Sequence, residues 1–200
     1  MPQQRAQPEH RHRVRHHTGV RIVPVLLAVL LAGCGGTAST SRFGEVPLRV
    51  ASPPGANEAG VYFATARGYD DAEGVQLQLT SEPADLQLVR RPPEGCVAVL
   101  AIVRPAKLVL CADEVLLQDE RDKVVAVARA LRRGYLQAQL EPAEAVEAMV
   151  QQVPGLDRDR LSSELDAAAP TWTAGAAFFG ELAPGPARDP SVAREANEDH

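Results

Sequence analysis

The stretch CVAVLAIVRPAKLVLCA, residues 96–112, decides the fold class because it holds two continuous apolar runs separated by a proline. The runs, 96–103 and 107–112, lack the polar alternation of a half-exposed strand. They therefore predict strands that are buried on both faces. Pro105 predicts a turn or crossing point between them. Strands of this kind need helices to cover them, so the rest of the chain should supply a helical layer.

The segments before this stretch predict strands and helices in alternation. PLRVAS (47–52) predicts a short strand, and GVQLQLTS (74–81) alternates apolar and polar residues with the period of a half-buried strand. GANEAGVYFATARGY (55–69) predicts a helix. PADLQLVRR (83–91) predicts a short amphipathic helix that the following prolines end.

Three helices are predicted after the apolar runs. Their signals are Asp119 as the cap of residues 119–139, Pro142 as the first residue of 142–153, and Asp157 as the cap of a helix that Pro170 ends. The first helix has an apolar stripe at i, i+3, i+4 spacing from Val124 to Tyr135.

The order of these elements predicts an α/β layered domain over residues 47–182, with a mixed sheet flanked by helices. After Leu182 the sequence is rich in proline, glycine and charge and has no periodicity. We therefore expect a disordered tail over residues 183–200.

The first 33 residues have the features of a bacterial lipoprotein signal peptide. Five arginines accompany an apolar run, residues 22–32, which is shorter than the roughly 20 residues of a membrane-spanning helix and suits a secretory signal. The run ends in LAGC (31–34), which resembles the lipobox, in which the cysteine receives a diacylglyceryl group. Residues 34–46 predict a flexible tether. The alternative is an ordinary secretory signal with a cysteine at the cleavage point.

Charge and histidine content exclude several classes of function. Cleavage before Cys34 removes five arginines and one glutamate, so the formal net charge changes from −5 to −9. Such an acidic chain is not expected to bind nucleic acid, and its membrane attachment would depend on the acyl chains. Four of the five histidines precede residue 34 and the fifth is His200. The core therefore lacks Ser–His and Cys–His catalytic pairs and the usual zinc ligands. We expect no enzyme activity, metal or cofactor.

Two cysteines, Cys96 and Cys111, remain in the mature domain, and no CxxC motif is present. Outside the cytoplasm they could form a disulfide. Their apolar surroundings are equally compatible with buried free thiols.

Two long segments resemble the solute-binding proteins of ABC importers in the alkanesulfonate, nitrate and thiamine-pyrimidine-precursor family. LRVASPPGANEAGVYFATARGYDDAEGVQLQL (48–79) resembles the opening of that family, with a strand, a loop, a helix, a Gly-Tyr turn and a second strand. Residues 107–157 resemble its closing part, in the returning strand, the AVARALRRGY helix, the EPAEAV helix start and the PGLD break. The resemblance implies one lobe of a type 2 periplasmic-binding-protein-like fold.

The chain departs from that family in its length. Family members have two lobes, and the second lobe is inserted between the two segments that build the first. Here these segments meet between Pro92 and Lys107, so the second lobe is largely missing. A lobe can bury its own core, but a cleft that encloses a ligand needs two walls.

The resemblance places part of the ligand site in residues 52–62, where Ser52, Asn57, Glu58 and Tyr62 are the candidate ligand-binding residues. Glu58 stands where thiamine-precursor members tend to have a histidine. Its charge would repel sulfonate or nitrate and favour a neutral or cationic ring. The structural alternatives are helix capping and first-turn charge for Asn57 and Glu58, and a core position for Tyr62. Trp172 is expected to seal the third predicted helix.

The resemblance implies a lipid-anchored component of an ABC importer on the outer face of the bacterial cell membrane. Its partners would be a small solute, such as a pyrimidine-type thiamine precursor or related heterocycle, and an ABC permease. The alternative is a lipoprotein without a transport role, whose lobe binds a partner or survives without a ligand.

Lipidation of Cys34 can be tested by intact mass spectrometry. Protein extracted from membranes should begin at Cys34 and carry a diacylglyceryl group, because the basic flank, short apolar core and LAGC box together specify that processing. Cys34→Ser should give an unmodified chain. Wild-type protein that retains residues 1–33 would contradict the prediction.

Overall fold

The two apolar runs are strands in the computed structural model, which describes residues 47–103, 108–172 and 174–198. They form β4 (Cys96–Val103) and β5 (Leu108–Asp113), which are antiparallel neighbours and buried along most of their length. This confirms the prediction for both runs. Pro105, the predicted turn between them, lies outside the described residues.

The sheet is open, five-stranded and mixed, with the order β2-β1-β3-β5-β4. Its other strands are β1 (Leu48–Ala51), β2 (Leu77–Thr80) and β3 (Leu86–Val89). β1 runs parallel to β2 and β3, whereas β5 runs antiparallel to β3 and β4. The α/β class with a mixed sheet is therefore confirmed, and strands from both halves of the chain share one sheet.

The prediction of a helix over residues 83–91 is wrong, because this segment contains β3. Leu86 and Leu88 are buried on one face while Gln87 and Val89 are less buried, which is the two-residue period of a strand. β3 lies between β1 and β5 and is hydrogen-bonded to both. These pairings with distant segments determine its conformation.

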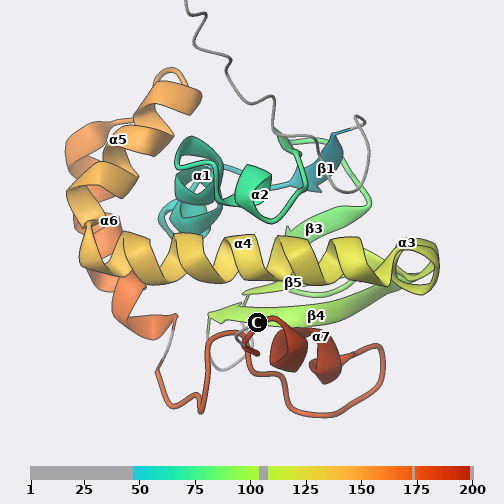
Figure 1. The fold of residues 1–200 in the computed structure, drawn as a ribbon. Helices are drawn as coiled ribbons and strands as arrows, with labels where there is room; N and C mark the ends of the chain where they lie inside the picture. Colours follow the sequence, from blue (N-terminus) through green and yellow to red (C-terminus); the bar gives the residue numbers. More distant parts are fainter. Residues whose placement is uncertain (1–46, 104–107, 173, 199–200) are drawn as a thin grey trace, which may run out of the picture. The chain divides into compact units, whose positions relative to one another are not determined.

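Helix α4 runs along the strands on the side of the sheet shown in Figure 1, with α1 and α2 beside it, while α5 and α6 pack against other helices. The helical elements are η1 (Ala56–Glu58), α1 (Ala59–Ala66), α2 (Tyr69–Ala72), α3 (Glu114–Asp119), α4 (Arg121–Leu140), α5 (Pro142–Gln152), α6 (Arg158–Ala168), η2 (Ala169–Thr171) and α7 (Pro190–Glu195). The predicted stripe from Val124 to Tyr135 is buried.

Two of the three predicted start signals are correct. Pro142 is the first residue of α5, and the Asp157 carboxylate accepts a hydrogen bond from the Arg160 N–H at 3.0 Å. Asp119, in contrast, does not cap a helix but ends α3, which Asp113 caps. The predicted helix over 119–139 is thus two helices, α3 and α4, separated at Glu120, whose backbone leaves the helical conformation.

Helices α1 and α4 cross in close contact at Gly60 and Gly134. A Cβ atom on Gly134 would lie 2.2 Å from the Gly60 carbonyl oxygen and 2.7 Å from Ala64 Cβ. A Cβ atom on Gly60 would lie 2.3 Å from the Tyr135 ring. No side chain fits at either position, so these glycines set how closely the helices pack.

The prediction of a disordered tail over residues 183–200 is wrong for the part that the structure describes. Residues 187–189 pair with the outer edge of β4, where the Ala98 N–H donates to the Ala187 carbonyl and the Asp189 N–H donates to the Ala98 carbonyl, both at 2.9 Å. In α7, Val192 is fully buried. Arg121 of α4 holds this segment through ion pairs with Asp189 and Glu195, each at 2.7 Å. The long exposed edge of β4 would otherwise leave its backbone groups unpaired. Residues 187–189 cover it through backbone hydrogen bonds, which need no apolar periodicity in the sequence.

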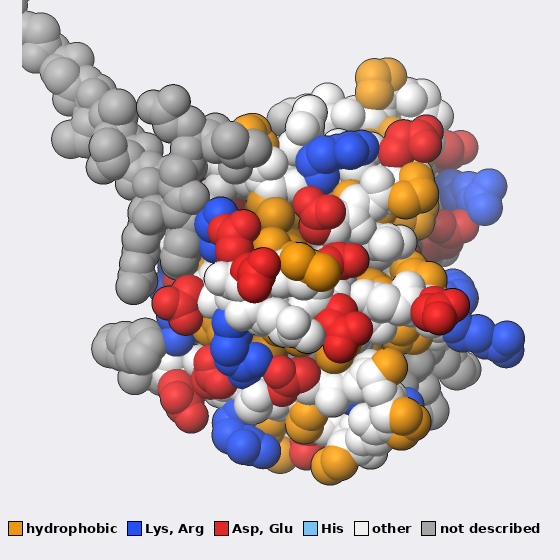
Figure 2. Space-filling model, turned by 90° about the vertical axis from the view of Figure 1, so that its right-hand side faces the viewer, with side chains coloured by type: hydrophobic (Ala, Val, Ile, Leu, Met, Phe, Trp, Pro, Cys, Tyr) orange, Lys and Arg blue, Asp and Glu red, His pale blue; other side chains and the backbone are white. Residues whose placement is uncertain are grey.

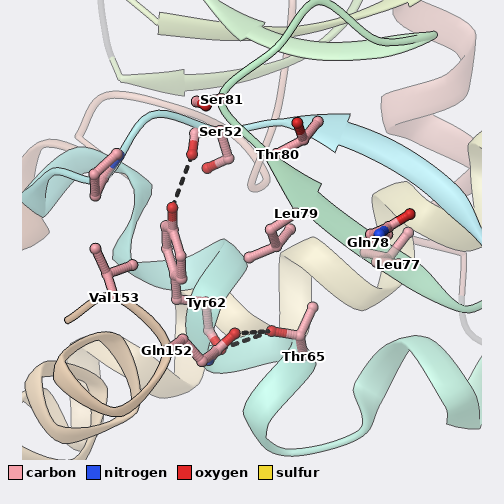
Figure 3. Close-up of a pocket in the computed structure, with 11 residues that line it drawn as sticks. Ser52, Tyr62, Thr65, Leu77, Gln78, Leu79, Thr80, Ser81, Gln152 and Val153 are labelled. Carbon is pink, nitrogen blue, oxygen red and sulfur yellow. Dashed lines mark hydrogen bonds between the residues drawn. The ribbon is translucent and has the colours of Figure 1, made fainter.

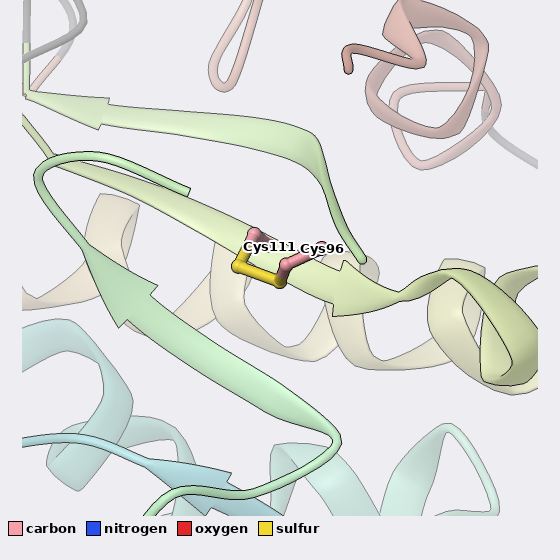
Figure 4. The surroundings of a disulfide bond; sticks show 2 residues. All are labelled: Cys96 and Cys111. Atoms are coloured by element: carbon pink, nitrogen blue, oxygen red, sulfur yellow. A yellow bond between two sulfur atoms is a disulfide. The ribbon is translucent and has the colours of Figure 1, made fainter. Parts of the chain in front are cut away.

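Cys96 and Cys111 form a disulfide between β4 and β5 (Figure 4). Of the two alternatives from the sequence, the structure therefore has the paired one. The residues are diagonal neighbours, since Cys111 lies opposite Ala98 in the strand register. Both are buried, so the bond lies within the core of the sheet.

The predicted signal peptide, Cys34 and the tether, together residues 1–46, lie outside the described residues. Among the helices that the structure describes, none is both long enough and apolar enough to cross a membrane.

Removal of the disulfide should lower the free energy of unfolding substantially. The cysteines are 15 residues apart, and closing a loop of that size contributes about 3 kcal/mol. Urea unfolding of the Cys96→Ala/Cys111→Ala double variant should show this loss, and reduction of the native chain should reproduce it. A loss below about 0.5 kcal/mol, the scatter of neutral substitutions, would contradict the disulfide's structural role.

Gly134→Ala should destabilise the fold by about 1–3 kcal/mol, because the added methyl group overpacks the helix crossing. Helix propensity alone would make alanine more stable than glycine by about 1 kcal/mol. A loss of stability must therefore come from the clash at the helix crossing. Ser162→Ala on the exposed face of α6 is the control, with an expected change within about 0.5 kcal/mol. Stabilisation by Gly134→Ala would show that the helices do not pack this closely.

Candidate functional site

The loop after β1 turns directly into η1 and α1, and α4 holds its end in place. The Glu58 N–H donates to the Gly55 carbonyl at 3.0 Å, and the Tyr135 hydroxyl donates to the Asn57 carbonyl at 2.9 Å. A Cβ atom on Gly55 would lie 2.7 Å from the Glu58 Oε2 atom. Glycine at position 55 therefore leaves room for the Glu58 carboxylate to lie against the loop.

A pocket of about 520 Å³ lies where β1, β3 and β4 end, and we call it the strand-end pocket. Its polar lining comprises Asn57, Glu58, Arg90, Glu164 and Thr171. β1 and β3 are parallel neighbours. After β1 the chain continues to β2 on one side of this pair, and after β3 it continues to β4 on the other side. Open α/β sheets bind ligands outside such a switch point, so the pocket has the position of a ligand site.

The charges around the strand-end pocket favour neutral or cationic groups. Glu58 is only 9% exposed, and this burial raises the pKa of its carboxyl group, while a hydrogen bond to the Glu58 backbone and the positive charge of Arg90 partly offset the rise. On α6, Glu164 accepts a hydrogen bond from Arg160 Nε at 2.8 Å. An anion in this pocket would face the carboxyl groups of Glu58 and Glu164 against the single guanidinium of Arg90, whereas a hydrogen-bond donor or a cation could bind to Glu58.

A second pocket, of about 580 Å³, lies between β2, α1 and the end of α5 (Figure 3), and we call it the edge-strand pocket. The Tyr62 hydroxyl donates to the Ser52 carbonyl at 2.8 Å. The Gln152 side-chain amide donates to the Tyr62 carbonyl at 2.8 Å, and its oxygen lies 3.0 Å from the Thr65 hydroxyl. These bonds connect the loop after β1 to α5.

The structure divides the four predicted ligand-binding residues between the two pockets. Asn57 and Glu58 line the strand-end pocket, while Ser52 and Tyr62 line the edge-strand pocket. Their ligand-binding role stays a prediction. Neither η1 nor α1 begins with a side-chain capping bond, so the capping interpretation of Asn57 and Glu58 is wrong, although Glu58 is a first-turn acid. Tyr62 is a core residue, 4% exposed.

Sequence reasoning missed several residues that line these pockets. Arg90 directly follows β3. It was missed because residues 83–91 were predicted to be a helix; a predicted strand would have made the residue after it a candidate for the ligand site. Gln152, Glu164 and Thr171 come from α5, α6 and η2. Only the folding of these helices against the loop brings them near it, so no local signal marks them. Trp172 is buried and packs edge-on against Tyr135 of α4 with ring centroids 4.8 Å apart; its expected role of sealing the third predicted helix stays a prediction.

The described residues contain no cluster of three or more His, Cys, Asp or Glu side chains that could hold a metal ion. Comparison with models of known protein families gives no match, and comparison with curated proteins gives none either.

The raised pKa of Glu58 predicts that the native chain and the Glu58→Gln variant differ in stability by an amount that depends on pH. Because the folded chain holds this proton more tightly than the unfolded chain, whose pKa is near 4.5, the contribution of Glu58 to stability is greatest below that pH and falls as pH rises through the folded pKa. Glu58→Gln stays neutral and avoids this loss. The variant should therefore be more stable than the native chain at pH 7, and the difference should close towards pH 4.

Chemical unfolding at pH 4 and pH 7 measures this difference, with the exposed Glu82→Gln as the control, for which we expect a change within about 0.5 kcal/mol at both pH values. Lower stability of Glu58→Gln at pH 7 would show that the backbone hydrogen bond and Arg90 together stabilise the ionised carboxylate more than burial disfavours it.

Proposed function

We propose that this chain is the lipid-anchored, extracytoplasmic solute-binding component of an ABC importer, shortened to one lobe of a type 2 periplasmic-binding-protein-like fold. The observation that carries the proposal is the strand-end pocket. It lies at the switch point of the sheet and includes Asn57 and Glu58, which belong to the segment that the family resemblance assigns to the ligand.

The topology of the sheet supports the one-lobe interpretation. In the family, both ends of the chain build the first lobe, and a strand returns to that lobe after the inserted second lobe. Here β5 enters the sheet between β3 and β4 and runs antiparallel to both. Only residues 104–107 connect β4 to β5, so the position at which a second lobe would be inserted holds a short connection instead.

The proposed ligand is a small neutral or cationic organic molecule, such as a pyrimidine-type thiamine precursor or a related heterocycle. Buried Glu58 could accept hydrogen bonds from amino groups on such a ring, and Asn57 and Thr171 add uncharged polar groups to the pocket. Acidic and basic side chains are interspersed on the face shown in Figure 2, without a broad basic patch among its described residues. This distribution gives no support to binding of nucleic acid.

The disulfide supports the proposed location outside the cytoplasm. Disulfides persist in oxidising compartments and are rare in the cytosol, and the bond between Cys96 and Cys111 joins the edge strand β4 to its neighbour β5. The predicted lipobox cysteine, Cys34, is a separate feature of the sequence that leads to the same compartment.

One observation favours the alternative, a lipoprotein without a transport role. The strand-end pocket is bounded only by this lobe, so a ligand would keep part of its surface in water. Apolar burial contributes about 25 cal/mol per Å², so the loss of about 100 Å² of contact weakens binding by roughly 70-fold. A second chain could supply the missing wall, or the lobe could bind a protein partner instead of a solute.

A titration of the full-length chain carrying Cys34→Ser tests the proposal, with amide NMR signals as the readout. Cytosine should bind in the millimolar range and shift the signals of Asn57 and Glu58, because one wall of the cleft is present and carries the Glu58 carboxyl group. Nitrate and ethanesulfonate should leave those signals unchanged. Glu58→Ala should weaken cytosine binding at least fivefold, and the exposed Glu82→Ala should not affect it.

Three results would count against the proposal. Preference for nitrate or ethanesulfonate would overturn the ligand class. Micromolar cytosine binding by the monomer would refute the argument that a wall of the cleft is missing. The absence of any shift at Asn57 and Glu58 with all three probes would favour the lipoprotein without a transport role.

A further inference from the structure

The edge-strand pocket is separate from the strand-end pocket and lies over a different part of the sheet. No lining residue is shared between the two. Its walls come from β2, from α1 and from the end of α5, and Ser52 lies at its upper end in Figure 3, next to the Tyr62 hydroxyl. Its volume of about 580 Å³ is within the range of small-molecule sites, roughly 300–1,000 Å³.

The described lining of this pocket contains no charged side chain. Leu77, Leu79 and Val153 provide apolar surface, and the remaining side chains are hydroxyls, amides, a proline and a tyrosine. An ion that entered this pocket would lose hydration without gaining a counter-charge, which is unfavourable. The lining therefore selects an uncharged molecule with an apolar part.

One polar group of the lining has no partner. Ser52 is 1% exposed, and its Oγ atom has no hydrogen-bond partner in the structure. The neighbouring polar groups are engaged, since the Tyr62 hydroxyl donates to the Ser52 carbonyl and the Gln152 amide donates to the Tyr62 carbonyl. A buried hydroxyl without a partner destabilises a fold, so such a group beside a pocket indicates a ligand that supplies the missing bond.

We propose that the edge-strand pocket is a second binding site, which takes a small uncharged molecule with an apolar ring or chain and one hydroxyl or amide group. The apolar part lies against Leu77, Leu79 and Val153, and the polar group bonds to Ser52 Oγ. Ser52 and Tyr62 also belong to the segment that the family resemblance assigns to the ligand, but this site is inferred only from the lining of the edge-strand pocket, all of which the structure describes.

Three probes with the same ring and different charge test the site on the full-length Cys34→Ser chain. Benzamide is neutral, benzoate is an anion and benzylammonium is a cation. Benzamide should shift the amide signals of Ser52, Thr65 and Gln152 in a saturable way. Both charged probes should bind there at least tenfold more weakly, because the pocket offers no counter-charge.

Ser52→Ala should weaken benzamide binding at least fivefold while the unfolding midpoint stays the same or rises, because the substitution removes an unpartnered hydroxyl without leaving a donor unpaired. Val153→Phe, at the half-buried wall of the pocket, should block binding by filling space. The exposed Ser162→Ala is the matched control and should leave binding unchanged.

The proposal fails if benzamide gives no saturable shift at these residues, if benzoate binds equally well, or if Ser52→Ala leaves binding intact. It also fails if Ser52→Ala lowers stability, since the hydroxyl would then have a permanent partner such as a bound water. Signals of Asn57 and Glu58 report the strand-end pocket separately, so failure of the proposed function and failure of this site are distinguishable.

Discussion

The crossing of α1 and α4 at Gly60 and Gly134 is the contact on which the rest of the structure depends. Because neither position carries a side chain, the two helix backbones approach closely enough for the Tyr135 hydroxyl to reach the Asn57 carbonyl. That bond fixes the start of α1, and with it the position of Glu58 in the strand-end pocket. The same helix, α1, carries Tyr62 and Thr65 into the edge-strand pocket. One helix crossing therefore positions residues of both candidate sites.

A single lobe is stable only if its sheet is covered and its edges are protected. The C-terminal segment covers the outer edge of β4, and Arg121 holds that segment to α4. The disulfide joins β4 to β5 within the core. Together these features protect the β4 edge of the sheet and link β4 to its neighbour. The strand-end pocket is left open, and this is why the proposed function requires either weak solute binding or a second wall from another chain.

Most local patterns in the sequence predicted the structure correctly, although the Asp119 cap signal was wrong. Continuous apolar runs identified β4 and β5, and Pro142 and Asp157 marked helix starts correctly. The other failures arose where distant contacts decide. β3 is a strand because β1 and β5 pair with it, and the tail is ordered because β4 offers backbone groups to residues 187–189. Neither partner can be read from the local sequence. Likewise, Asn57 and Glu58 were identified from one loop, whereas Arg90, Gln152 and Glu164 reach the pockets only through the folded helices and β3.

Native-state hydrogen exchange on the full-length Cys34→Ser chain tests most directly whether one lobe is a complete folding unit. Amides of β1 and β3, from the first half of the chain, should exchange with the same free energy of opening as those of β5 and α4, because all of them share one sheet and one core. Amides of α7 should be protected as well. Exchange of residues 48–89 at a much lower free energy than the second half would contradict the account, since the two halves would then fold separately.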